Sequence, residues 1–248
     1  MSRVRLDLLL VARGFAPTRE RARALILAGD VDVDGARITK AGTSVDEQAE
    51  LTLRRPDHPW VGRGGLKLAH ALDAFRVDVT GITALDIGAS TGGFTDVLLA
   101  RGAARVVALD VGTNQLDWKL RSDPRVMSLE GINARHLTAD MLPADARLFE
   151  LVTIDVSFIS LRHILPNVPP LLRPEGRVIV LVKPQFEAGR SEVGAGGIVR
   201  DPAVHERVIE SITEAAHRVG LDRLALETSP VTGAEGNREF LMLLAPRP

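Results

Sequence analysis

Residues 86–94 read Asp86-Ile87-Gly88-Ala89-Ser90-Thr91-Gly92-Gly93-Phe94, and this stretch decides the fold. We expect a nearly all-apolar strand over 84–87, a glycine-rich turn over 88–93 and a helix over 94–101. Glycines at a strand-to-helix turn let the backbone approach a ligand closely, at the edge of the sheet where α/β folds bind cofactors. The stretch therefore predicts a cofactor site in an α/β fold.

The sequence of this loop also limits which cofactor it can bind. It lacks the Gly-x-Gly-x-x-Gly pattern of dinucleotide sites and the Gly-Lys-Ser/Thr ending of a P-loop, which disfavours hydride and phosphoryl transfer. Asp110 is expected to close the next strand, where a carboxylate can accept hydrogen bonds from both hydroxyls of a ribose. This combination suits a cofactor with a cationic, amino-acid-like part and no phosphate. The candidate cofactor-binding residues in this region are Asp86, Gly88, Ser90, Thr91, Gly92, Gly93, Phe94 and Asp110.

On both sides of this stretch, apolar strands alternate with helical segments. Strands that are apolar on both faces and alternate with helices indicate a parallel, doubly wound sheet of the Rossmann type. The expected helical segments are 65–75, 160–172 and 203–219, and the further expected strands are 106–110, 126–129, 151–155, 178–182, 224–227 and 239–244.

Two charged residues stand at the ends of neighbouring strands in this sheet. Asp155 closes the strand over 151–155, and Lys183 follows the strand over 178–182. Because adjacent strands lie about 5 Å apart, a lysine and an aspartate at such ends can meet. A lysine held in a partly dry cleft can accept a proton from an alcohol, which is the work of a general base. Matched strand ends beside a cofactor loop favour this role over a structural ion pair.

The first 56 residues have a different organisation. Helices over 6–13 and 19–28 precede a half-buried strand and a hairpin turn at Asp34-Gly35, which makes a small α-α-β unit. Pro56 and Pro59 cannot continue a sheet ladder. The expected organisation is a small domain over 1–56, a linker over 57–62 and a large domain over 63–248.

Charge is distributed unevenly along the chain. The sequence has 31 basic and 32 acidic residues, so its net charge of −1 argues neither for nor against nucleic acid as a partner. Basic charge near one end is a reasonable electrostatic footprint for a polyanion, and solvated helix faces are the alternative. The candidate RNA-binding residues are Arg3, Arg5, Arg13, Arg19, Arg21 and Arg23.

The composition of the chain excludes several other classes of protein. There is no cysteine, which rules out a disulfide framework, a thiolate metal site and a cysteine nucleophile. The longest apolar run near the N-terminus, residues 8–12, is too short for a secretory signal, and no run approaches the roughly 18 apolar residues that cross a bilayer. We expect a cytoplasmic protein that has no membrane partner and no metal site.

Four residues complete a pattern that resembles a known family. Lys67 in Gly-Arg-Gly-Gly-Leu-Lys-Leu, Asp155, Lys183 and Glu239 in Gly-Asn-Arg-Glu-Phe are similar to the Lys-Asp-Lys-Glu tetrad of ribose 2′-O-methyltransferases related to FtsJ. More narrowly, the chain resembles the TlyA family, also called hemolysin A. Residues 5–7 and 29–35 are similar to the small RNA-binding domain that ribosomal protein S-four shares with pseudouridine synthases. The other matching segments are 86–97, 155–160, 182–187, 196–202 and 229–240.

The resemblance implies a reaction and a role for each tetrad residue. The reaction is methylation of a cytidine 2′-hydroxyl in ribosomal RNA, with S-adenosylmethionine as the donor. The RNA of the large subunit is the first candidate substrate, and that of the small subunit is an additional one. Lys183 would be the base or the orienting cation, Asp155 would fix its position, and Lys67 and Glu239 would hold the ribose. Phe158 would flank the cofactor, with a core position as the alternative, and Asn133 is a candidate contact for the adenine.

Three other functions are consistent with parts of the sequence. Asp155-Val-Ser-Phe158 resembles the Asp/Asn-Pro-Pro-Tyr/Phe loop of adenine N6-methyltransferases, but that chemistry needs no lysine base. A non-catalytic RNA-binding protein is disfavoured because all four tetrad positions are filled. A pore-forming toxin, which the name hemolysin suggests, is supported by no signal sequence, membrane span or amphipathic basic helix.

Overall fold

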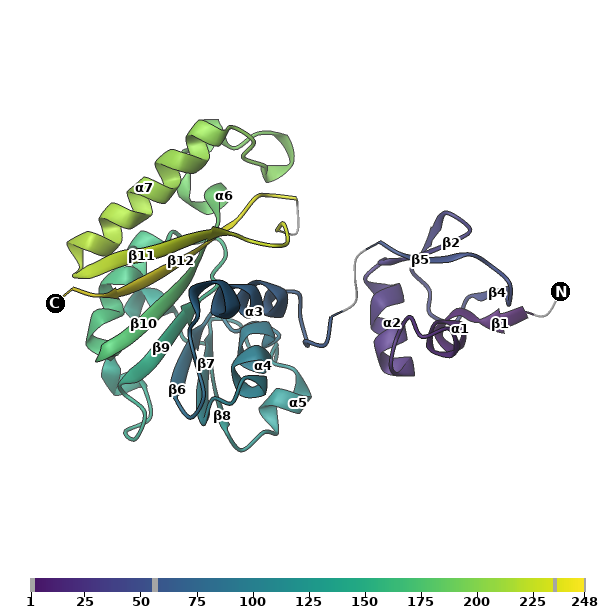
Figure 1. Cartoon of the computed structure of the whole chain (residues 1–248), viewed down its shortest axis with the longest axis horizontal. Coiled ribbons are helices and arrows are strands. Elements are labelled where there is room, and N and C mark those ends of the chain that lie inside the picture. The colour runs from purple at the N-terminus through teal and green to yellow at the C-terminus, as the bar shows by residue number, and fades with distance from the viewer. Residues whose placement is uncertain (1–2, 55–57, 234–235, 248) are drawn as a thin grey trace. The chain divides into compact units, whose positions relative to one another are not determined.

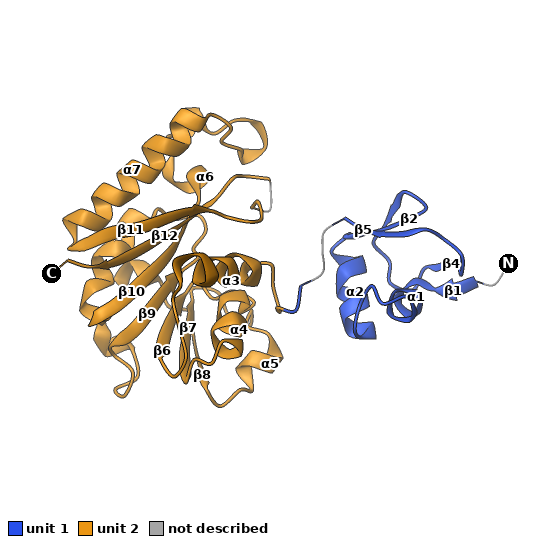
Figure 2. Cartoon of the chain, in the orientation of Figure 1, with its two compact units in different colours: residues 1–59 blue, residues 60–248 orange. Residues whose placement is uncertain are grey.

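The computed structural model of the chain describes residues 3–54, 58–233 and 236–247. The chain divides into two units, residues 1–59 and 60–248, which are coloured separately in Figure 2. The predicted domain end at residue 56 and the predicted linker start at residue 57 lie outside the described residues. The small unit has one hydrophobic core and the large unit has two.

The small unit has the predicted α-α-β order with one addition (Figure 1). Thr18 begins the second helix, since its Oγ1 accepts a hydrogen bond from the N–H of Arg21 at 3.2 Å. The hairpin turns at Asp34 and Gly35, which both have positive φ. The addition is an N-terminal strand that pairs antiparallel with a later one. The elements are β1 (Arg3–Arg5), α1 (Leu6–Ala12), α2 (Arg19–Leu27), β2 (Val31–Val33), β3 (Ala36–Ile38), β4 (Ser44–Asp46) and β5 (Leu51–Leu53).

The large unit is built on one seven-stranded sheet with the order β11-β12-β10-β9-β6-β7-β8. The five strands from β8 to β10 are parallel, as predicted. β12 departs from this pattern, because it runs antiparallel to both of its neighbours, β10 and β11. The strands are β6 (Thr83–Ile87), β7 (Arg105–Asp110), β8 (Val126–Glu130), β9 (Phe149–Ile154), β10 (Leu172–Val182), β11 (Leu221–Thr228) and β12 (Phe240–Pro246).

Apolar side chains pack on both faces of this sheet. In β6, Leu85 and Ile87 join the core that α7 covers, while Ala84 joins the core beneath α3 and α4. This two-sided burial explains the continuous apolar runs of the strands. The helices are α3 (Gly64–Phe75), α4 (Gly93–Ala100), α5 (Trp118–Arg121), α6 (Pro184–Glu187) and α7 (Pro202–Arg218).

The predicted helical segment 160–172 is wrong as a continuous helix. It consists of three single 3₁₀ turns, because Pro166, Pro169 and Pro170 lack the N–H that a longer α-helix requires. The 3₁₀ turns of the large unit are η1 (Ala134–His136), η2 (Ala139–Met141), η3 (Leu161–His163), η4 (Leu165–Asn167), η5 (Pro169–Leu171), η6 (Arg190–Glu192) and η7 (Ala195–Gly197).

Candidate active site

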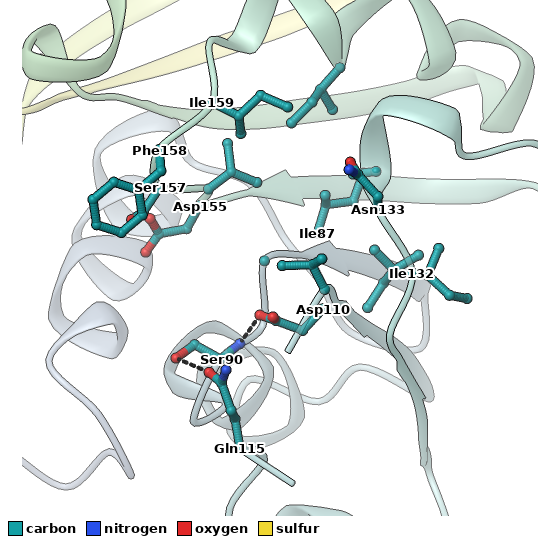
Figure 3. Close-up of a pocket in the computed structure, with 16 residues that line it drawn as sticks. Ile87, Ser90, Asp110, Gln115, Ile132, Asn133, Asp155, Ser157, Phe158 and Ile159 are labelled. Carbon is teal, nitrogen blue, oxygen red and sulfur yellow. Dashed lines mark hydrogen bonds between the residues drawn. The ribbon is translucent and has the colours of Figure 1, made fainter. Parts of the chain in front are cut away.

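The glycine-rich loop closes over the end of β6. Gly88 has φ 84°, and a Cβ on it would lie 2.3 Å from the carbonyl oxygen of Asp155. Only glycine therefore allows the β6 and β9 ends to lie this close. The Asp110 carboxylate holds the loop from the next strand, since it accepts the N–H of Ser90 at 2.7 Å (Figure 3). Its other oxygen accepts the N–H of Gly112 at 2.7 Å.

A pocket of about 340 Å³ opens beside this loop. Its lining includes five of the predicted cofactor residues, namely Gly88, Ser90, Asp110, Asn133 and Phe158. Figure 3 shows Ser90, Asp110 and Asn133 around the pocket, with apolar side chains such as Ile132 between them. A polar loop and a carboxylate beside apolar walls are suited to a nucleoside.

The other five predicted cofactor residues do not line this pocket. Asp86 is fully buried, and its carboxylate accepts hydrogen bonds from the hydroxyls of Thr95 at 2.7 Å and Thr153 at 3.0 Å. Burial raises the pKa of Asp86 to about 6, against the effect of these two hydrogen bonds. Asp86 therefore supports the loop from beneath. The remaining four are Thr91, which is exposed, and Gly92, Gly93 and Phe94, which are buried at the start of α4.

The four tetrad residues line a second cleft of about 530 Å³. Lys183 and Asp155 follow the ends of neighbouring strands, as predicted, and Lys183 Nζ lies 2.6 Å from Asp155 Oδ1. Lys183 Nζ also donates a hydrogen bond to the Ser157 hydroxyl at 2.9 Å. Lys67 Nζ, from α3, donates to Glu239 Oε2 at 2.6 Å. Each lysine is thus paired with a carboxylate within one cleft.

The cofactor-side pocket and the tetrad cleft are contiguous, because Asp155, Ser157 and Phe158 line both. Phe158 is 91% exposed and has φ 64°, a conformation that is strained for an aromatic residue. Strain of this kind is found mostly at functional sites. Its ring centroid lies 5.0 Å from that of Phe186, which lines the tetrad cleft.

Several residues of the two pockets were not predicted. Ser157 and Phe186 stand within the motifs that contain Asp155 and Lys183, so proximity in sequence could have found them. Asn237 likewise stands within the motif that contains Glu239, whereas Gln115 stands in none of the quoted motifs. Gln115 accepts a hydrogen bond from the Ser90 hydroxyl at 3.3 Å, and Asn237 lines the tetrad cleft.

Close packing between α3 and α4 positions Lys67 relative to the loop. A Cβ on Gly93 would lie 2.9 Å from the backbone nitrogen of Gly65. Residues before α3 strengthen this contact, since the N–H of Val61 donates to Asp96 in α4 at 2.9 Å. The place of Lys67 in the site, which spacing in the sequence could not predict, follows from this packing.

In the small unit, most of the predicted RNA-binding arginines already have partners within the protein. Arg5 and Arg19 donate to the buried carboxylate of Asp7, and these contacts hold the pKa of Asp7 well below its usual range. Arg13 donates to the carbonyls of Ala49 and Glu47. The remaining three are Arg3, which donates to the Ser44 carbonyl, Arg21, which donates to the His58 carbonyl, and Arg23, which is exposed.

Comparison with known families assigns both units. The model of the FtsJ-like methyltransferase family matches residues 60–245, and that of the S4 domain matches residues 4–51. Within the described residues, no helix is both long and apolar enough to cross a membrane.

Individual relatives match over nearly the whole chain. YqxC of Bacillus subtilis, provisionally named an rRNA methyltransferase, is 49% identical over 97% of this chain and 85% of its own length. TlyA of Mycobacterium tuberculosis, named a 16S/23S rRNA (cytidine-2′-O)-methyltransferase, is 44% identical over 98% and 90%. A solved structure from Streptococcus thermophilus, provisionally named a hemolysin, is 45% identical, covers 100% of this chain and 90% of its own, and has a TM-score of 0.78. The chain belongs to the FtsJ-like methyltransferase family, and within it to the TlyA and hemolysin A group.

Proposed function

We propose that this chain transfers a methyl group from S-adenosylmethionine to the 2′-hydroxyl of a cytidine in ribosomal RNA. The observation that carries the proposal is the pair of contiguous pockets that share Asp155, Ser157 and Phe158. One has the lining of a nucleoside site, and the other holds two lysine–carboxylate pairs. The choice of cytidine and of ribosomal RNA rests on the name of the M. tuberculosis relative.

The cofactor would be held at the loop end of β6. Each oxygen of Asp110 accepts one backbone N–H and retains a lone pair that can accept from a ribose hydroxyl. Asn133 Oδ1 accepts the N–H of Arg135 at 3.0 Å, which leaves the amide Nδ2 to donate to an adenine nitrogen. When bound, S-adenosylmethionine supplies a methyl carbon that its sulfonium already activates, so the protein has only to align the acceptor and remove one proton.

The proton of the 2′-hydroxyl would pass to Lys183. Its Nζ contacts two of the three shared residues, Asp155 at 2.6 Å and Ser157 at 2.9 Å. These two contacts fix the direction of the side chain. Lys183 would accept the proton as a free amine, and Asp155 would stabilise the ammonium that forms.

The second pair would hold the ribose. Glu239 is 2% exposed and bonds Lys67, and both side chains line the same cleft as Lys183. A lysine supplies three donors and a carboxylate supplies several acceptor sites. The pair can therefore bond the remaining ribose oxygens while Lys183 faces the hydroxyl that reacts.

The small unit would bind the RNA. Its match to the S4 domain and its exposed arginines support phosphate contacts. The target nucleotide must leave its stack to enter the cleft. Ribosomal subunits are the proposed partners, and the cytoplasm is the proposed location, because that RNA is found there.

The test is methyl transfer to isolated ribosomal subunits with radiolabelled S-adenosylmethionine. We expect label in RNA and, after alkaline hydrolysis, in a dinucleotide, because a 2′-O-methyl group blocks cleavage of the adjoining phosphodiester. Label released in a mononucleotide would place the methyl group on a base. That result would overturn the proposal and favour the adenine N6 alternative.

A further inference from the structure

Asn237 stands two residues before Glu239 and lies at the tetrad cleft. It is 1% exposed, and both ends of its carboxamide are bonded to one loop. Nδ2 donates to the carbonyl of Gly197 at 2.9 Å, and Oδ1 accepts the N–H of Val199 at 3.0 Å. The side chain thus joins two segments that are far apart in the sequence.

Apart from Val199, which is 2% exposed and packs in the core, the loop over 194–199 has few other means of holding its position. Gly196 and Gly197 have φ near 75° and contribute no side chains. The loop turns on itself, since the N–H of Gly194 bonds the carbonyl of Ile198 at 3.0 Å. Its anchors lie outside it: the Asn237 carboxamide, and His205, whose Nε2 is 3.0 Å from the Val199 carbonyl oxygen.

Asn237 also connects this loop to the tetrad. The backbone carbonyl of Asn237 accepts the N–H of Gly233 at 2.8 Å. Gly233 lies directly against Glu239, because a Cβ there would be 2.6 Å from Oε1. Gly197, Gly233, Asn237 and Glu239 all line the cleft that contains Lys183.

We propose that Asn237 is a positioning residue for the acceptor: its carboxamide fixes the glycine-rich loop as a wall of the tetrad cleft and so sets how the target nucleoside sits at Lys183. This inference rests on the proposed function. A buried amide with both ends bonded specifies one geometry of the segments it joins. A displacement of about 1 Å in substrate position can cost about 10²-fold in rate.

The decisive variant is Asn237→Asp, which has the same shape. A carboxylate can still accept from Val199, but it cannot donate to Gly197 and repels that carbonyl oxygen. We expect about a 10²-fold lower kcat for RNA methylation at saturating cofactor, with an unchanged Kd for S-adenosylmethionine. The control is Ser229→Ala, which removes a 2.6 Å side-chain hydrogen bond to Val231 in the same hairpin without touching the loop. It should keep wild-type kcat.

Hydrogen exchange provides a second readout that does not depend on activity. In Asn237→Ala the N–H of Val199 loses its acceptor, so we expect faster exchange there and unchanged exchange in the β6–β9 region. Wild-type kcat in Asn237→Asp, or unchanged exchange at Val199, would overturn the inference. Loss of cofactor binding along with activity would overturn it too, because it would indicate a general structural role. If the wild-type chain methylated a base, the proposed function itself would fail, whereas these outcomes concern Asn237 alone.

Discussion

Lys183 and Asp155 illustrate how far single residues could be predicted. Both were expected from their places at strand ends, and their side chains lie 2.6 Å apart. Asp86 shows the limit, because it occupies the expected strand but faces Thr95 and Thr153 beneath the loop. The direction of a side chain at the end of a strand depends on neighbouring strands, which the local sequence does not contain.

Lys183→Ala tests the proton acceptor. A positioned general base contributes about 10²–10⁴-fold to rate, so we expect a loss of that size in single-turnover methylation, with cofactor affinity retained. Lys183→Arg should not restore the rate, because a guanidinium stays protonated and cannot take the proton. Activity in the arginine variant would mean that Lys183 acts only as a positive charge.

Asp86 predicts a pH dependence of stability. Its pKa is about 6 in the folded chain and 3.8 when unperturbed, so the folded state holds the proton more tightly. The unfolding free energy should therefore fall as pH rises from about 4 to 6 and stay lower above that, by about 3 kcal/mol in all. Asp86→Asn lacks this titration. The difference in unfolding free energy between variant and wild type, measured by urea unfolding, should therefore shift by about 2 kcal/mol in favour of the variant from pH 4.5 to pH 7. A difference that does not depend on pH would contradict the assignment.

At the scale of elements, strands and long helices followed from apolar periodicity. Residues 160–172 did not, because three prolines turn an apolar helical pattern into separate 3₁₀ turns. The pairing of β1 with β4 and the reversed direction of β12 were missed as well. Both are pairings between distant segments, and the sequence of each strand alone carries no signal of direction.

The arginines of α2 and its neighbours divide into two kinds. Arg13 bonds backbone carbonyls of the small unit, whereas Arg23 is exposed and has no side-chain partner within the described residues. We expect Arg23→Ala to weaken binding to ribosomal subunits and to lower the salt dependence of the binding constant by the equivalent of about one phosphate contact. The melting temperature should not change. Arg13→Ala should lower the melting temperature of the small unit. Equal effects of the two variants on both measurements would contradict this division.

For the whole molecule, the parallel order of five strands brings the glycine loop, Asp110, Asp155 and Lys183 to one edge of the sheet. That edge could be predicted, because it follows from strand alternation alone. The wall built from the 194–199 loop and Asn237 could not, since it depends on hydrogen bonds between segments about 40 residues apart. The chain thus combines a predictable cofactor side with an acceptor side that only the structure defines.

The two units should be separable in function. A shortened chain of residues 60–248 keeps both large cores and the Val61–Asp96 contact. We expect it to bind S-adenosylmethionine as the full chain does, in calorimetry, and to lose most methylation of ribosomal RNA. Methylation equal to that of the full chain would show that the small unit is not needed to bind the RNA.

The central claim, methylation of a ribose in ribosomal RNA through Lys183, is tested most directly in cells. The measurement is a map of 2′-O-methyl positions in ribosomal RNA from cells with and without this protein, and from cells supplied with the wild type or Lys183→Ala. We predict that a cytidine mark disappears without the protein, returns with the wild type and does not return with Lys183→Ala. An unchanged map, or a mark restored by Lys183→Ala, would contradict the claim.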